Sequence, residues 1–294
     1  SVKSSGNGSF SDNDPSYPDV VVAEVRNTDE AEVDAAIDAA SNFAPAWDAV
    51  SIDERAGALD KAADLLEQRL PEFMVLCTRE AGKTVNDTIA EVREAVDFLR
   101  YYAARAREQF GSAKTLHGPT GEHNELSLHG RGVFVCISPW NFPLAIFMGQ
   151  VSAALVAGNT VLAKPAEQTP LIAYRAVQIL HEAGIPRAAL QLLPGDGATV
   201  GARLTSDPRI AGVAFTGSTE VARTIQRQLA AREGAIPVFI AETGGQNLMV
   251  VDSSALPEQV VGDVLASSFN SAGQRCSALR VLCLQEDIAD RVLH

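Results

Sequence analysis

Apolar residues along the first 110 positions recur at the spacing of amphipathic helices. One apolar stripe follows Thr28. A second follows residues 51–54, where S-x-x-E forms a capping box that satisfies free backbone N–H groups. A third segment lies between Pro71 and Gly82, and residues 84–109 are expected to form one long helix. The stripes contain Val33, Ala36, Ile37 and Ala40, then Leu59, Ala62, Ala63, Leu66 and Leu70, then Val92, Val96 and Leu99. These faces are expected to pack together rather than to carry chemistry.

Residues 110–131 break this pattern. Glycine and proline recur through the segment, and leucines alternate with polar residues near its end, which predicts a hairpin-like excursion. Its expected role is that of an oligomerisation flap. Three histidines recur here at six-residue spacing, but neither cysteine nor a cluster of acids accompanies them, so we expect no metal site. They are His117, His123 and His129.

From residue 132 onward, short apolar runs rich in β-branched residues alternate with helical stretches. The runs are Val133–Ile137, Thr160–Ala163, Leu190–Leu193, Val213–Phe215, Val238–Ala241 and Met249–Val251. The helical stretches are Leu144–Ala157, Pro170–Ala183, Ala198–Thr205 and Glu220–Ala231. This alternation predicts an α/β fold with a Rossmann-like parallel sheet covered by helices on both faces. Ligands of such sheets bind beyond the carboxyl ends of the strands, so the residues after each run are candidates for chemistry.

The composition narrows the class of protein. The chain has 294 residues, 46% of them hydrophobic, which is enough for about two domains. Its net charge of −13 argues against nucleic acid or an anionic membrane as a partner. No apolar run approaches the ~20 residues of a transmembrane helix. The four cysteines form no C-x-x-C pair, which favours a reducing, cytoplasmic setting. Residues 1–18 are expected to be a disordered linker or cloning tail outside the fold.

Two strand ends carry polar groups suited to an oxyanion or a nucleotide. Residues 138–143 read SPWNFP, a rigid turn in which Asn141 presents a neutral amide donor, although a turn asparagine is more often structural. Lys164 and Glu167 follow the next run and could hold a ribose. The carboxylate would also repel a 2′-phosphate and favour NAD over NADP. The alternative is a surface ion pair of little energetic weight.

Three further segments suggest anion binding and covalent catalysis. Residues 216–219 form a glycine-containing turn before a helix, which suits an anion, although the G-x-G-x-x-G fingerprint is absent. A second glycine-rich segment, Gly195 to Gly201, has the wrong spacing for that fingerprint. Glu242 lies beside two glycines, where a carboxylate could act as a general base. Cys276 could attack a carbonyl carbon, with its own backbone N–H and Asn141 stabilising the oxyanion. The alternative is an inert cysteine that behaves as a small hydrophobic residue.

The segments SPWNFPL, KPAEQTP, FTGSTEVA, ETGGQN and GQRCSA, in this order, resemble the NAD(P)-dependent aldehyde dehydrogenase superfamily. Within it, GRGVFVCISPWNFPLAIFMGQVSAAL and AETGGQNLMVVDSSALPEQVV are similar to the glutamate semialdehyde dehydrogenase domain of the bifunctional proline-utilisation flavoproteins. The resemblance implies an NAD-binding domain over residues 19–243 and the start of a catalytic domain over residues 244–294. Because the family's catalytic domain continues well beyond its cysteine, the resemblance also implies an incomplete, truncated domain.

The resemblance further implies a mechanism. Cys276 is expected to form a thiohemiacetal with the aldehyde, Asn141 to stabilise its oxyanion, and Glu242 to activate water for thioester hydrolysis. Ser277 is expected to hold the substrate carboxylate. The expected NAD contacts are Ile137, Ser138, Pro139, Trp140, Lys164, Glu167, Phe215, Thr216, Gly217, Ser218, Thr243 and Gly244. The parent protein is expected to carry a proline dehydrogenase flavin domain and to form a homo-oligomer when complete.

Three functional hypotheses stay open at this point. The chain is part of a dehydrogenase for glutamate semialdehyde, a non-catalytic module that binds NAD, or part of a dehydrogenase for another aldehyde. Within the last class the acyl group could pass to coenzyme A, but Glu242 favours hydrolysis because it supplies a base for water.

Overall fold

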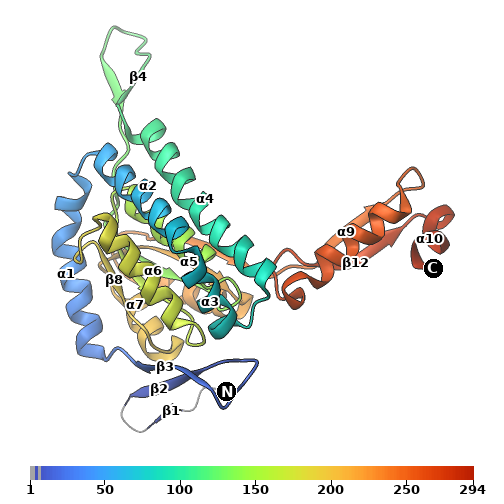
Figure 1. Ribbon diagram of the computed structural model, residues 1–294. Helices are drawn as coiled ribbons and strands as arrows, with labels where there is room; N and C mark the ends of the chain where they lie inside the picture. The colour runs from blue at the N-terminus through green and yellow to red at the C-terminus, as the bar shows by residue number, and fades with distance from the viewer. Residues whose placement is uncertain (1–3, 6–7) are drawn as a thin grey trace.

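A computed structural model describes residues 4–5 and 8–294 of the chain (Figure 1). At its centre is a five-stranded, all-parallel sheet in the order β10-β9-β6-β7-β8. Its strands are β6 (Val133–Ile137), β7 (Thr160–Lys164), β8 (Leu190–Leu192), β9 (Ile210–Gly217) and β10 (Val238–Thr243). The predicted parallel sheet is therefore confirmed, with every strand within a few residues of its expected position.

Helices cover both faces of this sheet. On one face lie α5 (Ala145–Val156) and α6 (Pro170–Ala183), and behind them α2 (Ile52–Gln68), α3 (Leu70–Ala81) and α4 (Val85–Phe110). On the other lie α1 (Glu30–Asp48), α7 (Ala202–Ser206) and α8 (Thr219–Ala230). Neighbouring strand residues serve opposite cores, since Phe134 packs with the first group of helices and Val135 with the second. The four N-terminal helices confirm the predicted stripes, and Ser51 makes the predicted capping box with Glu54.

The first eighteen residues correct the sequence prediction. From Gly8 onward they belong to the fold, because β2 (Ser9–Asn13) pairs with β3 (Val21–Arg26) and with the short β1 (Ser4–Ser5). The prediction for residues 1–3 and 6–7 lies outside the described residues. Polar residues hid these strands: β2 reads SFSDN, and its two buried side chains are Phe10 and Asp12. A second correction concerns residues 198–205, where a π-helical turn, η1 (Gly197–Gly201), precedes α7.

The three-stranded meander is attached to the helices through buried carboxyl groups. Asp12 and Glu80 are 4% and 3% exposed and their side chains contact each other. Burial raises the pKa of both groups, and their proximity to each other raises that of Glu80 further, so the pair holds a proton that ordinary carboxyls would lose. Beside them Asp14 pairs with Arg79 at 2.9 Å.

Two segments project from this body (Figure 1). One is an antiparallel hairpin of β4 (Lys114–Leu116) and β5 (Asn124–Leu126), as predicted for residues 110–131. The described residues contain no cluster of His, Cys, Asp and Glu that could hold a metal ion, and His123 instead lies 2.9 Å from Glu125. No helix in the described part of the chain is long and apolar enough to cross a membrane.

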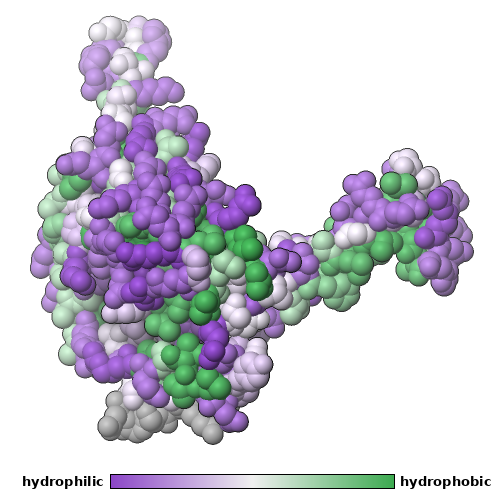
Figure 2. Space-filling model, viewed as in Figure 1, coloured by the Kyte–Doolittle hydropathy of each residue, from purple (hydrophilic) through white to green (hydrophobic). Residues whose placement is uncertain are grey.

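The second projection is the C-terminal arm, residues 247–294. It contains β11 (Asn247–Val251), α9 (Pro257–Phe269), the 3-10 turn η2 (Asn270–Gly273), β12 (Leu279–Leu284) and α10 (Glu286–Leu293). The predicted strand at 249–251 is present, but β11 pairs in parallel with β12 in a separate sheet. The arm buries only a small core, and apolar side chains remain on its surface, as Figure 2 shows. These are Leu248, Val250, Leu256, Val261, Leu265, Phe269, Val281 and Leu293.

The Asp12–Glu80 pair predicts a pH-dependent stability. Burial raises the pKa of Asp12 to about 6, so the folded chain binds a proton that the unfolded chain releases near pH 4, and stability falls as the pH rises between these values. Asp12→Asn removes this charge beside Glu80. We expect it to raise the melting temperature by ~2–4 °C at about pH 8 and to have no effect at about pH 4. Thermal unfolding followed by circular dichroism checks this, and an equal effect at both pH values would contradict it.

Candidate active site

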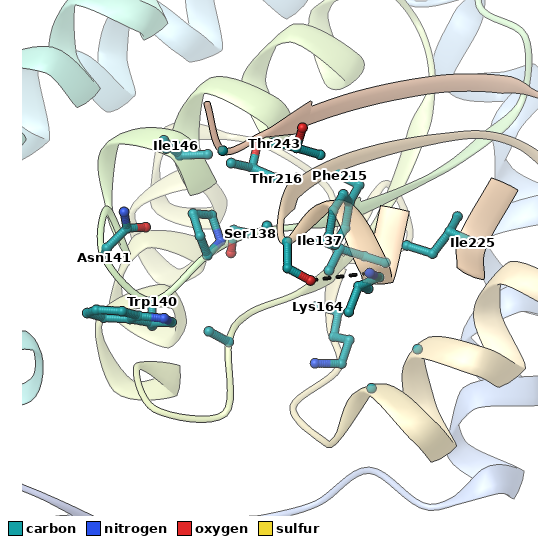
Figure 3. Close-up of a pocket in the computed structure, with 18 of the residues that line it drawn as sticks. Ile137, Ser138, Trp140, Asn141, Ile146, Lys164, Phe215, Thr216, Ile225 and Thr243 are labelled. Atoms are coloured by element: carbon teal, nitrogen blue, oxygen red, sulfur yellow. Dashed lines mark hydrogen bonds between the residues drawn. The ribbon is translucent and has the colours of Figure 1, made fainter. Parts of the chain in front are cut away.

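A cavity of about 820 Å³ opens at the carboxyl ends of β6, β7, β9 and β10 (Figure 3). The chain order reverses here, because β7 and β8 lie on one side of β6 and β9 and β10 on the other. Open α/β sheets bind ligands at such a point, and the volume suits a small molecule or cofactor. In Figure 3, Trp140 and Asn141 lie at one end, Lys164 and Ile225 at the other, and Phe215 and Thr216 between them.

The cavity gathers most of the residues singled out from the sequence. All twelve expected cofactor contacts line it, together with Asn141 and Cys276. The wall does not include Glu242 or Ser277. Glu242 is an exposed residue of the edge strand β10, and its neighbour Thr243 is the one that faces the cavity. The structure thus brings the predicted nucleophile and oxyanion donor to one cavity, without the predicted base.

Lys164 is the buried cation of this site. Its side chain is 5% exposed, and Nζ donates to the Glu167 carboxylate at 3.3 Å and to the Pro165 carbonyl at 3.2 Å. Burial lowers the pKa of Lys164, and the charge of Glu167 opposes that shift. A buried ammonium and a carboxylate at the cavity wall supply a donor and an acceptor for sugar hydroxyls. Because the Lys164 side chain is buried, the pair is not the exposed surface ion pair that the sequence left open as an alternative. Its donor and acceptor could instead bind the ribose of a dinucleotide.

Several wall residues were missed or discounted in the sequence. Gly197 and Gly201, in the segment whose spacing did not match a dinucleotide fingerprint, lie in the wall at the turn before α7. Gly201 packs beside the side chain of Lys164, where a Cβ would come 3.7 Å from its Cδ and Cε methylene groups. Its role comes from a π-turn, which has no simple sequence signature. The remaining unforeseen lining includes Val221, Thr224 and Ile225 on the inner face of α8, and Ala202 and Thr205 of α7.

The first turn of α8 is the expected anion site. Ser218 is its N-cap, and the Ser218 hydroxyl accepts a hydrogen bond from the Val221 N–H at 3.2 Å. Thr216, before this turn, is held by Gln150 of α5, whose amide donates to the Thr216 hydroxyl at 2.9 Å and to the Ile137 carbonyl at 3.3 Å. Gln150 therefore ties the ends of β6 and β9 together below the cavity. A helix N-terminus in the same cavity wall as the buried Lys164 suits the phosphates of a dinucleotide.

The loop that carries Cys276 is fixed by donors from three directions. Asn141 Nδ2 donates to the Gln274 carbonyl at 2.6 Å, and Asn247 Nδ2 donates to the Cys276 carbonyl at 2.6 Å. Arg275 Nη2 donates to the Ala266 and Ser267 carbonyls at the end of α9. Asn141 thus places an amide donor two residues from the exposed thiol.

The turn before this loop is conformationally strained. Ser271 and Ala272 have φ of 53° and 54°, in the left-handed region that few residues other than glycine adopt, and Gly273 follows at 67°. The Ser271 hydroxyl donates to Asp87 at 3.1 Å, and Arg280 donates to the Gly273 carbonyl at 2.6 Å. Strained turns of this kind occur at functional sites, where surrounding contacts hold them. In the sequence, this turn and the loop after it are marked by two arginines near the cysteine, Arg275 and Arg280, both of which donate to backbone carbonyls here.

The profile of the aldehyde dehydrogenase family matches residues 2–294. The chain belongs to the aldehyde dehydrogenase family. It is 58% identical to the bifunctional protein PutA of Klebsiella aerogenes, over 95% of this chain and 20% of that protein. It is 38% identical to 1-pyrroline-5-carboxylate dehydrogenase 2 of Bacillus subtilis, over 95% of this chain and 55% of that protein.

Solved structures agree with this family membership. A crystal structure of bifunctional proline utilization A (PutA) superposes with a TM-score of 0.90 at 58% identity, covering 92% of this chain and 28% of that one. A 1-pyrroline-5-carboxylate dehydrogenase from Thermus, described with bound NAD, superposes with a TM-score of 0.92 at 35% identity, covering 97% of this chain and 56% of that one. This aldehyde dehydrogenase chain therefore spans about a fifth of the curated PutA relatives and about half of the separate dehydrogenases.

The four cysteines predict a specific labelling pattern. Cys276 and Cys283 are exposed, whereas Cys77 and Cys136 are buried and burial raises the pKa of both thiols, that of Cys136 to about 12. Because the thiolate is the reactive form, iodoacetamide is expected to modify only the exposed pair in the native protein and all four after unfolding. Peptide mass spectrometry checks this, with Cys276→Ser as control. Labelling of Cys136 in the native protein would contradict the burial of that strand.

Proposed function

We propose that this chain is part of an NAD-dependent dehydrogenase that oxidises L-glutamate γ-semialdehyde to glutamate in proline catabolism. The observation that carries the proposal is the shared cavity, which joins Cys276 and Asn141 at one end to the Lys164–Glu167 pair at the other. The support for this substrate is the similarity to PutA and to 1-pyrroline-5-carboxylate dehydrogenases. Small-molecule aldehyde and dinucleotide would then meet at the carboxyl ends of the strands.

The chemistry begins at Cys276. Its thiolate attacks the aldehyde carbon to give a thiohemiacetal, whose oxyanion is stabilised by the Asn141 amide and the Cys276 backbone N–H. NAD, when bound, supplies the hydride acceptor that converts this species to a thioester. Glu242 then acts as base toward a water molecule, which hydrolyses the thioester, releases glutamate and restores the thiol. Ser277 is proposed to hold the substrate carboxylate.

The twelve residues expected from the sequence are proposed to hold NAD. Lys164 and Glu167 hold the adenosine ribose, and Gly217 and Ser218 at the start of α8 lie against the phosphates. The Thermus relative described with bound NAD supports this cofactor. The partners proposed for the whole protein are a proline dehydrogenase flavin domain, in keeping with the bifunctional PutA relatives, and further copies of the chain.

A specific observation favours a second candidate for the chain by itself, a module that binds NAD without catalysis. Glu242 and Ser277 do not line the cavity, and the arm that carries Cys276 extends away from the body (Figure 1). Binding of dinucleotide needs only residues of the sheet and its helices, whereas thioester hydrolysis needs Glu242 near Cys276. The two candidates therefore differ in turnover rather than in cofactor binding.

The decisive experiment measures NADH formation from glutamate semialdehyde by absorbance, beside NADH binding by fluorescence. Both are measured on this chain and on a protein extended to the length of the 1-pyrroline-5-carboxylate dehydrogenases. Turnover in the extended protein, lost in Cys276→Ser, is the expected result. Binding without turnover in both proteins would favour the non-catalytic module, and turnover only with other aldehydes would overturn the substrate.

The charge of Glu167 is expected to favour NAD(H) over NADP(H). Its side chain is partly exposed, so its repulsion of a 2′-phosphate is expected to be worth ~0.5–1 kcal/mol. Glu167→Gln should therefore strengthen NADPH binding relative to NADH by about two- to fivefold. Fluorescence titrations with both reduced cofactors measure the ratio. Glu182→Gln removes the same charge from an exposed residue outside the cavity and is the matched control. An unchanged ratio in Glu167→Gln would contradict the proposed ribose contact.

A further inference from the structure

Two buried residues hold the Asn141 loop from behind, and neither lines the cavity. Glu91 of α4 is 1% exposed, and its Oε1 accepts hydrogen bonds from the backbone N–H groups of Leu144 at 2.9 Å and Ala145 at 3.1 Å. These groups begin α5. The N-cap of α5 is Leu144, which has no side-chain oxygen that could accept them. A carboxylate from a different helix therefore caps the helix that follows the Asn141 loop.

Lys83 completes this contact. It lies in the turn between α3 and α4, and its Nζ is 2.6 Å from Glu91 Oε2 and 4.1 Å from the centroid of the Phe142 ring. An ammonium over an aromatic face is attracted by the ring's electrons, and more strongly when both are removed from water. Phe142 directly follows Asn141, so the loop is held at Phe142 by Lys83 and at Leu144 by Glu91.

We propose that Lys83 and Glu91 are positioning residues that set the Asn141 amide for the oxyanion formed at Cys276. This inference rests on the function proposed above. The Asn141 amide reaches the Gln274 carbonyl, two residues before the nucleophile, so a displacement of its loop moves the donor away from Cys276. Oxyanion donors act only when they are held in place beforehand, and a shift of about 1 Å can reduce the rate about a hundredfold.

Several carboxyl groups surround Lys83 and Glu91, so the positive charge of Lys83 is needed to balance them. The Glu80 and Glu94 carboxyls and the Cys77 thiol interact electrostatically with this cluster, together with Glu91. The positive charge of Lys83 acts on both Cys77 and Glu94. Removing it leaves Glu91 buried as an anion without its counter-ion, which is strongly unfavourable. The loop is then expected to shift so that water or another donor reaches the carboxylate.

The first test uses the chain itself and needs no turnover. The protein has two tryptophans, and Trp47 is buried with its indole N–H bonded to the Leu155 carbonyl, so acrylamide quenching reports mainly on Trp140 beside Asn141. Because Trp140 is already 42% exposed, Lys83→Met and Glu91→Ala are expected to raise the quenching constant by up to about twofold. Glu91→Gln, whose amide oxygen can still accept from α5, should keep the quenching constant close to that of the unsubstituted protein.

The matched control is Asp207→Asn. Asp207 is also a buried carboxylate that accepts from a backbone N–H, that of Arg209, but it precedes β9 at the opposite end of the sheet from the cavity. It should lower the melting temperature without changing Trp140 quenching. If Lys83→Met and Glu91→Ala behave like this control, the pair is only structural and the proposal is overturned.

The second test measures kinetics in the protein extended to the length of the dehydrogenase relatives. Glu91→Ala is expected to reduce kcat about 10- to 100-fold with less than threefold change in the KM for aldehyde, and Glu91→Gln to recover most of kcat. Unchanged kcat in both Lys83→Met and Glu91→Ala would refute the positioning role. If the unsubstituted extended protein has no turnover at all, the proposed function fails, whereas Trp140 quenching still decides whether the pair orders the loop.

Discussion

Two helices of the sheet layer begin without a side-chain cap of their own, and both are capped by buried carboxylates from another layer. Glu91 accepts from the first N–H groups of α5, and Glu80 accepts from Leu171 and Ile172 at 2.5 and 2.8 Å in the first turn of α6. Each helix follows a loop that lines the cavity. Because the free N–H groups of a helix must be satisfied, these carboxylates determine where each loop ends and its helix begins. The shape of the cavity thus depends on the helices α3 and α4 behind the sheet.

Removing the Glu80 and Glu91 carboxyl groups from water costs free energy, and a different neighbouring group offsets this cost in each case. Glu91 has the buried Lys83 ammonium 2.6 Å from its carboxylate as a counter-ion. Glu80 has Asp12 as a neighbour instead, and the two carboxyls together hold a proton. The N-terminal meander, which supplies Asp12, is therefore part of the same polar network as the loops of the cavity. Asp12 thereby joins the mainly polar strand β2 to the helices of the body.

Local patterns in the sequence were enough to predict the parallel sheet and the helices that cover it, whereas most of the expected cavity residues came from the family resemblance. The sheet and its helices depend on neighbours along the chain: alternation of apolar runs, turn residues after each strand, and the Ser51 capping box. The failures depended on distant residues. Thr169 has the side chain of an N-cap before Pro170, but it makes no capping hydrogen bond. Glu80 takes that role, since it accepts from the backbone N–H of Leu171, 91 residues away along the chain. Strand β2 was missed because a buried aspartate, rather than an apolar residue, occupies a core position.

The position of the nucleophile follows the same principle as the rest of the cavity. The arm buries too small a core to place Cys276 by packing, and much of its apolar surface remains exposed. Side-chain amides and guanidinium groups place it instead, by donating to the backbone carbonyls of residues 273, 274, 276 and 278. One of these donors, Asn141, comes from the body, in the loop that leads into α5. A single chain of contacts therefore runs from Lys83 and Glu91, through Asn141, to the loop of Cys276.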